Sequence, residues 1–180
     1  GNVMEANEDG TYSLEYGTYS YSVTMEGYVP EYGKFTVDTA GEKTVTIAMR
    51  AVGGAIWDGT TLTEPEKDEN GVYLIGTGPE LAWFAANHNS ANAKLTADIS
   101  LGGFGVTISN YKGGTFDGNG HYITDLYGQS LFQLPSGGAV IKNLGVSGIV
   151  KQNNTSWLIP QGGIVASMYG NTNEFTVESC

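Results

Sequence analysis

The chain has 180 residues, of which 40% are hydrophobic, so it can bury one ordinary core or two small ones. Its formal net charge is −11 and Arg50 is its single arginine, so it lacks the basic surface that binds nucleic acid or anionic lipid. No apolar run is long enough to span a bilayer. We therefore expect no nucleic-acid partner and no membrane insertion of this segment.

The N-terminal part predicts strands. Residues 11–49 alternate apolar and polar side chains, as in Tyr19, Tyr21 and Val23 and again in Val45 and Ile47, and glycines recur between the runs. A period of two with regularly spaced turns is typical of antiparallel strands. We expect residues 1–52 to form a small antiparallel β-sandwich. About four strands are few for that fold, so its first strand would precede residue 1.

The composition changes near residue 50, which indicates a boundary between two modules. Residues 51–60 form a Gly-rich joint, and an acidic loop follows it. Residues 1–70 carry 13 acidic and 4 basic side chains, whereas residues 71–180 carry 6 and 4. We expect the second module to span residues 53–180.

One helix is expected, at residues 79–88. Pro79 suits a first helical turn, and Leu81, Phe84 and Ala85 have the spacing of one buried helical face. His88 lies near the C-terminal end, and we interpret it as a structural residue rather than a metal ligand. The helix would cover the open N-terminal end of the second module.

A short repeat follows the helix. Ile123-Thr-Asp-Leu126 recurs 18 residues later at residues 141–144 and, after a further 36 residues, at residues 177–180. Gly-rich turns separate the copies, which indicates units of about 18–25 residues, and units this small must stack to bury their apolar faces. The expected fold class is therefore all-β, with a small antiparallel β-sandwich followed by a right-handed parallel β-helix and its capping helix. Cys180, the only cysteine, permits no internal disulfide and should point into the core.

Several stretches of the second module resemble a known repeat. They are "YLIGTGPELAWFAANHN", "AKLTADISL", "KGGTFDGNGHYITDL", "SLFQL", "VIKNLGVSG" and "GGIVA". Over roughly residues 55–180 they resemble the GLUG-motif β-solenoid of bacterial adhesin-like surface proteins. Residues 11–49 resemble, more loosely, PEGA-like or carboxypeptidase-regulatory-like β-sandwiches. The resemblance implies an extracellular stalk without catalytic residues, and a repeat that is truncated at residue 180.

The stretch "GTFDGNGHYITDL", residues 114–126, allows two interpretations. Asp117 and Asn119 are residue types of a calcium loop, but an EF-hand loop starting at Asp117 would need a carboxylate at Gly128. Asp-Gly and Asn-Gly also favour tight turns. We expect a turn and keep Asp117 and Asn119 as weak calcium candidates. We predict no metal site and no cofactor.

Groups for catalysis are sparse in the second module. A glycosidase needs two carboxylates across a groove, and Asp117 and Asp125 are the nearest pair in sequence. A polysaccharide lyase needs a cationic base, for which Lys112 and Lys142 are available. His121 is interpreted as a solvated turn residue. We therefore expect no enzyme and keep a catalytic β-helix only as an alternative.

Aromatic side chains support another alternative, a carbohydrate-binding module of a secreted glycan-degrading protein. Trp157 lies in an excursion between repeats, residues 152–161, and together with Tyr127 and Tyr169 it would make a platform that stacks on sugar rings. Loops on a rigid scaffold often carry function. Packing of these rings on the module itself is the competing interpretation.

The function expected from the sequence is that of a non-enzymatic structural or adhesion segment of a secreted or cell-surface bacterial protein. It would act as a stiff stalk or an interaction scaffold. Its partners would be a surface glycan or protein. An open end of the repeat would also allow end-to-end self-association, since unpaired strand edges are templates for further strands.

Overall fold

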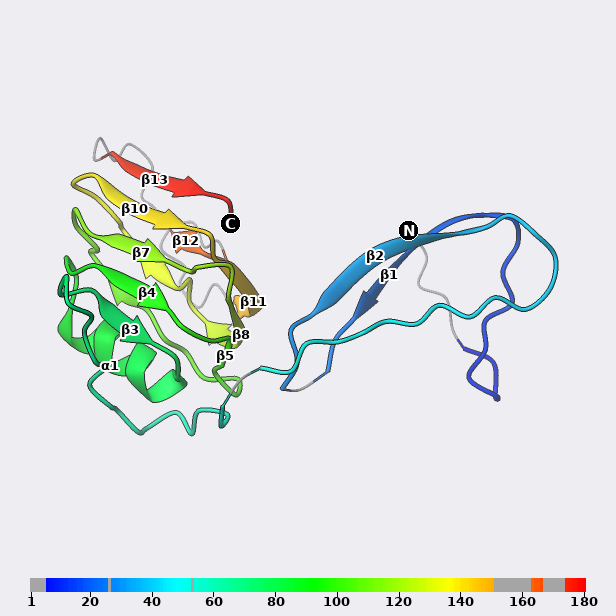
Figure 1. Cartoon of the computed structure of the whole chain (residues 1–180), viewed down its shortest axis with the longest axis horizontal. Coiled ribbons are helices and arrows are strands. Elements are labelled where there is room, and N and C mark those ends of the chain that lie inside the picture. Colours follow the sequence, from blue (N-terminus) through cyan, green and yellow to red (C-terminus); the bar gives the residue numbers. More distant parts are fainter. Residues whose placement is uncertain (1–5, 26, 53, 151–162, 167–173) are drawn as a thin grey trace, which may run out of the picture. The chain divides into compact units, whose positions relative to one another are not determined.

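The computed structural model describes residues 6–25, 27–52, 54–150, 163–166 and 174–180. The chain divides into two compact units (Figure 1). Unit 1 comprises Gly1–Met25 and Pro30–Met49, and unit 2 comprises Glu26–Val29 and Arg50–Cys180.

Unit 1 is built on one antiparallel hairpin, in which β1 (Gly17–Val23) pairs with β2 (Glu31–Val37). Half-buried and exposed residues alternate along both strands, as the sequence pattern indicates. On the half-buried face Tyr19 lies opposite Phe35, and their rings stack with 5.7 Å between centroids. Such a cross-strand aromatic pair stabilises the hairpin.

The β-sandwich expected for residues 1–52 is wrong. Within the described part of unit 1, β1 and β2 form a two-stranded sheet with no second sheet, and no side chain is buried. Residues 44–50 were expected to form a strand, but they belong to no strand and Val45 is 40% exposed. Alternation identifies residues that suit a strand, whereas a sandwich also requires partner strands that the pattern does not supply.

The described part of unit 2 contains one helix and eleven strands. In chain order these are β3 (Tyr73–Ile75), α1 (Gly78–Asn87), β4 (Ala93–Leu95), β5 (Ile99–Ser100), β6 (Ile108–Ser109), β7 (Thr115–Asp117), β8 (Tyr122–Gly128), β9 (Phe132–Gln133), β10 (Ala139–Lys142), β11 (Gly145–Val150), β12 (Val165–Ala166) and β13 (Phe175–Glu178).

The strands of unit 2 form three sheets in which every pair is parallel. The strand orders are β13-β10-β7-β4-β3, β11-β8-β5 and β12-β9-β6. From β4 onward, consecutive strands of the chain enter the three sheets in rotation. Figure 1 shows the five strands of the largest sheet side by side. Residues 66–68 cover the outer side of β3, where the Leu74 amide donates to the Glu66 carbonyl at 2.8 Å.

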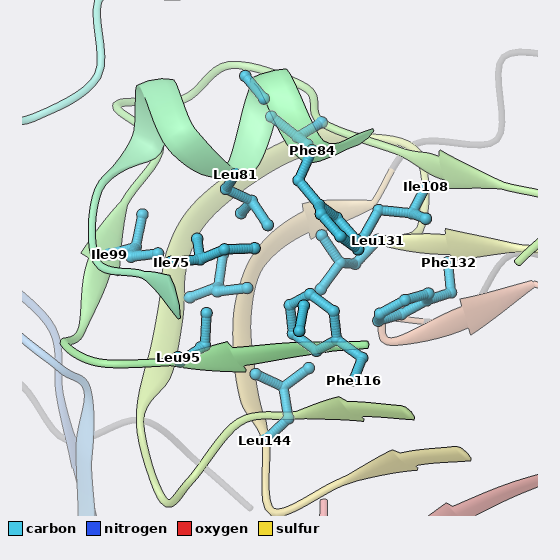
Figure 2. Packing of buried hydrophobic residues seen from close by; sticks show 14 of the residues in the cluster. Ile75, Leu81, Phe84, Leu95, Ile99, Ile108, Phe116, Leu131, Phe132 and Leu144 are labelled. Atoms are coloured by element: carbon cyan, nitrogen blue, oxygen red, sulfur yellow. The ribbon is translucent and has the colours of Figure 1, made fainter. Parts of the chain in front are cut away.

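One hydrophobic cluster holds α1 and the three sheets together (Figure 2). Leu81 and Phe84 of α1 have no exposed surface, and neither do Phe116 of β7 and Phe132 of β9. The Phe116 ring meets those of Phe84 and Phe132 edge to face, with centroids 6.0 and 5.1 Å apart. These are favourable arrangements for aromatic rings. The helix is therefore part of the core.

The helix is defined at its first turn by a capping arrangement. Thr77 is the extended N-cap residue, and its hydroxyl accepts a hydrogen bond from the Glu80 amide at 3.4 Å. The Glu80 carboxylate in turn accepts from the Gly76 amide at 2.8 Å. Pro79 occupies the first turn, where its missing N–H costs nothing. The helix expected at residues 79–88 thus runs from Gly78 to Asn87, and His88 is its C-cap residue.

The expected fold class, an all-β sandwich followed by a β-helix, is wrong. Unit 2 is a small α/β-type unit that combines several parallel sheets with one helix. The helix was expected to cover one end, but Leu81 and Phe84 place it in the same core as the strands. The sequence pattern identified individual apolar runs and did not show that a helix and three separate sheets share one core.

Neighbouring strands have the spacing of the upper end of the expected 18–25 residues per unit, and not the 18-residue spacing of the first two motif copies. Ile123 pairs with Ile99 in the sheet of β5 and β8, whereas Ile141 pairs with Phe116 in the sheet of β7 and β10. Neighbours in the sheets are thus 24 and 25 residues apart. The later copy fits better, because Val177 does lie beside Ile141.

Candidate functional site

Asp117, the first candidate from the sequence, ends β7 at a tight turn. Its Oδ1 accepts hydrogen bonds from the Asn119 amide at 2.8 Å and from Asn143 Nδ2 at 3.0 Å. Lys142 Nζ lies 3.6 Å from Oδ2. Burial by itself would raise the pKa of Asp117, but the two hydrogen bonds and the charge of Lys142 together lower it. The carboxylate is therefore held in its charged form by the neighbouring strand and turn.

Asn119 connects the same turn to the other neighbouring strand. Its φ of 54° lies in the left-handed region that Asn tolerates, and its Nδ2 donates to the Leu95 carbonyl at 3.3 Å. The turn is thus bonded to the chain on both sides, toward Leu95 and toward Asn143. Both weak calcium candidates have protein partners in this arrangement, and a lysine lies beside the carboxylate. Within the described residues no three His, Cys, Asp or Glu side chains gather as metal ligands.

Asp117 also belongs to a row of charged residues across the outer side of the largest sheet. Lys94 lies beside Asp117, Asp117 beside Lys142, and Lys142 beside Glu178. The sign of the charge therefore alternates over four adjacent strands, β4, β7, β10 and β13. Opposite charges in neighbouring positions favour this strand register, and like charges would disfavour it.

A polar cluster that the sequence did not reveal is centred on Asp98, whose side chain is 7% exposed. Its Oδ1 accepts from the Tyr122 amide at 2.9 Å and from Arg50 Nη2 at 3.2 Å. Arg50 Nε lies 2.9 Å from Oδ2, so the guanidinium binds the carboxylate in a bidentate manner. The same guanidinium lies over the Tyr122 ring, 5.3 Å from its centroid.

His121 belongs to this cluster as well. Its Nδ1 lies 3.2 Å from Asp98 Oδ1 and its side chain is 27% exposed. The interpretation of His121 as a solvated turn residue is therefore wrong, because the imidazole binds a buried carboxylate. All partners of Asp98 in the cluster are donors from this chain. The cluster therefore anchors residue 50 and the start of β8 to the loop before β5.

The sequence contained two signals for this cluster. Arg50 is the only arginine, and Asp98 is a charged residue between the apolar residues Leu95 and Ile99. A buried acid needs a partner, and arginine is the residue that most often supplies it. The signals are 48 residues apart in the chain, so their pairing was visible only in the structure.

The remaining candidates for catalysis have separate surroundings. Asp125 Oδ2 accepts from Ser100 Oγ at 2.7 Å and from Thr124 Oγ1 at 3.0 Å. None of these partners is shared with Asp117, so the two acids do not form a joint site. Lys112 is exposed and lies in an isolated bridge with Ser136.

His88 lies among aromatic rings at the end of α1. Its Nε2 is 2.6 Å from the Tyr73 hydroxyl, and its ring lies 4.6 Å from that of Tyr73 and 5.2 Å from that of Trp83. Lys67 Nζ lies 4.3 Å from the centroid of the Tyr73 ring. His88 thus joins the helix end to β3, in the structural role that the sequence suggested.

Tyr127, the candidate sugar-stacking residue that the structure describes, lies in an exposed apolar row. Its amide donates to the Phe104 carbonyl at 3.2 Å, and on the other side Tyr127 lies beside Ile149. Phe104, Tyr127 and Ile149 are 44%, 40% and 59% exposed. We call these three residues the apolar row. Trp157 and Tyr169, the other two candidates, lie outside the described residues.

Cys180 is exposed, so the expectation that it points into the core is wrong. Its Sγ lies 3.2 Å from the Glu178 carbonyl and 3.8 Å from the Ile141 carbonyl. The repeat places it where Leu126 and Leu144 are buried, but nothing in the described structure covers this position. Among the described helices, none is long and apolar enough to cross a bilayer.

No known protein-family model, curated protein or solved structure matches the chain. The resemblance of residues 55–180 to the GLUG motif therefore stays a prediction from the sequence.

Proposed function

We propose that this chain is a non-enzymatic structural or adhesion segment of a secreted or cell-surface bacterial protein, acting as a stiff stalk or interaction scaffold. The observation that carries the proposal is the way its acidic and amide side chains bond one strand to the next. Asn119 donates to Leu95, and Asn143 donates to Asp117, so the turn after β7 is tied to both of its neighbours. Side chains that bond one turn to its neighbours resist separation of the strands, which suits a load-bearing role. The extracellular location rests on the resemblance to adhesin-like proteins.

The scaffold proposal is tested by pulling unit 2 in an optical trap. Cys180 is exposed and is the only cysteine, so it provides one attachment point, and Asp58→Cys in the exposed loop provides the other. We expect cooperative unfolding at a defined force, and a lower force after Asn143→Ala. Asn70→Ala, in the exposed loop before β3, is the matched control and should leave the force unchanged. Gradual extension, like that of an unstructured linker, would contradict the proposal.

A second candidate function, glycan binding, is favoured by the apolar row. Exposed aromatic rings stack on sugars, and Phe104, in the loop between β5 and β6, is hydrogen-bonded through its backbone to Tyr127 of β8. A glycan-array screen tests it, with Tyr127→Ala as the variant and Tyr32→Ala, 66% exposed in unit 1, as the control. Binding that only Tyr127→Ala abolishes would support this function. Absence of binding across the array would contradict glycan binding by the apolar row. Binding that both variants retain would contradict it as well.

A further inference from the structure

The outer edge of β13 differs from the other edge of the same sheet. Residues 66–68 cover β3, whereas no described strand lies beyond β13. The Glu174 and Glu178 carbonyls accept hydrogen bonds from the amides of Gly138 and Asn143, which flank β10, at 2.9 and 3.1 Å. Because backbone groups alternate in direction along a strand, those of Phe175 and Val177 face the free edge. An incoming strand would meet these groups, since no described strand lies on this side of β13.

Side chains at this edge continue two rows that begin deeper in the sheet. In the inner row, Phe116 and Ile141 have no exposed surface, but Val177 beside them is 43% exposed. In the outer row, the alternating charges of Lys94, Asp117 and Lys142 end at the exposed Glu178. The next member of the inner row would be apolar, and the next member of the outer row would be basic.

We propose that the edge of β13 binds an extended peptide strand in parallel orientation, with an aliphatic residue beside Val177 followed by a lysine or arginine beside Glu178. Main-chain hydrogen bonds would give affinity, and the two side-chain positions would give selectivity, as in other cases of strand addition. Charge complementarity determines the choice of a basic strand, since the sign of the charge alternates along the row from Lys94 to Glu178.

A second copy of this chain fits the edge poorly. Antiparallel pairing of two β13 strands about Thr176 would place Glu174 of each copy opposite Glu178 of the other, and such like charges repel. Pairing of β13 with β3 of another copy would meet the chain at residues 66–68, and Leu74 would lie at the charged position. The structure thus favours a basic partner strand over the end-to-end self-association expected from the sequence. This inference does not depend on the scaffold proposal.

Titration of the whole chain with a fluorescein-labelled peptide tests the proposal. The probe is GGAVIKNL, the sequence of residues 137–144, which places its isoleucine beside Val177 and its lysine beside Glu178. The control peptide, GGAVIENL, differs only in that charge. We expect anisotropy to show saturable binding of the lysine peptide, and roughly three- to tenfold weaker binding of the glutamate peptide. Amide exchange should slow at Phe175 and Val177.

Two variants separate strand addition from unspecific attraction. Glu178→Lys should exchange the preference of the two peptides. Val177→Pro removes an outward amide without removing a bond to β10, so it should abolish binding. Unchanged exchange of the Phe116 amide checks that each variant is folded. Equal binding of both peptides, or a preference that Glu178→Lys does not change, would overturn the proposal. A further outcome would also overturn it. If, without peptide, amide exchange at Val177 becomes slower as the protein concentration rises, the edge pairs with a second copy of the chain.

Discussion

Asp117 illustrates at the scale of one residue how a sequence signal for a ligand site can have a structural origin. The Asp-Gly-Asn-Gly run has the residue types of both a calcium loop and a turn. The structure uses its two polar side chains to bond the neighbouring turns through Asn143 and Leu95. Local residue types could predict the turn, because turn chemistry depends on adjacent residues. They could not predict the partners, which lie 24 and 26 residues away.

Asp117→Asn should make the stability of unit 2 less sensitive to acid. The folded-state pKa of Asp117 is lowered from 3.8, so its contribution is fully present above that value and is lost as the pH falls through the folded-state pKa. We expect the variant to lose about 1 kcal/mol of unfolding free energy at pH 7, and less as the pH approaches 3. Urea unfolding followed by the fluorescence of buried Trp57 measures this. Glu69→Gln is the control, and a loss independent of pH would contradict the prediction.

At the scale of secondary-structure elements, the helix is the one whose boundaries follow most directly from local sequence. Thr77, Pro79 and Glu80 define its start through short-range contacts. The strands of unit 2 were less predictable, because most have two to four residues and their pairing is entirely long-range. The apparent 18-residue repeat aligned Ile123 with Ile141, which lie in different sheets. Two apolar residues three positions apart recur too easily to determine register.

Thr77→Ala should destabilise unit 2 by about 1 kcal/mol, because the Glu80 amide loses its acceptor at the first turn. The change leaves the apolar side of the helix intact, so the fold should persist. Chemical denaturation compared with the wild-type chain measures the loss. Thr39→Ala, at an exposed turn position in unit 1, should leave the unfolding of unit 2 unchanged. Equal effects of the two substitutions would argue against a specific role of the cap.

At the scale of the whole molecule, the two units have different means of stabilisation. Unit 2 has a continuous core that includes Phe84, Phe116 and Phe132. Unit 1 has no buried side chain among its described residues and depends on one hairpin. An isolated two-stranded hairpin is marginally stable in water. Alternation predicted β1 and β2 correctly, but it also predicted a strand around Val45 that is absent, and it could not show that the described part lacks a second sheet.

Amide exchange should therefore distinguish the units. We expect amides of β1 and β2 to exchange on a much shorter timescale than those of β7 and β10, since exchange follows the local opening free energy. Mass spectrometry of the intact chain after pulsed labelling measures both regions in one sample. Tyr19→Ala should accelerate exchange in the hairpin by removing its stacked partner, without changing exchange in β7. Uniform protection across both units would show that they unfold as one.

The Arg50–Asp98 pair has a practical consequence for dividing this chain into pieces. A fragment that begins at residue 53, where the composition changes, would lack Arg50. The Asp98 side chain, which is 7% exposed, would then lose the guanidinium that binds it. The carboxylate would keep the Tyr122 amide and His121 but lose its charged bidentate donor, which costs about 1 to 3 kcal/mol. A fragment that begins at residue 48 would retain the pair, so two expression boundaries only five residues apart should yield proteins of clearly different solubility and melting temperature. The ion pair therefore shows that unit 2 includes a residue upstream of the change in composition.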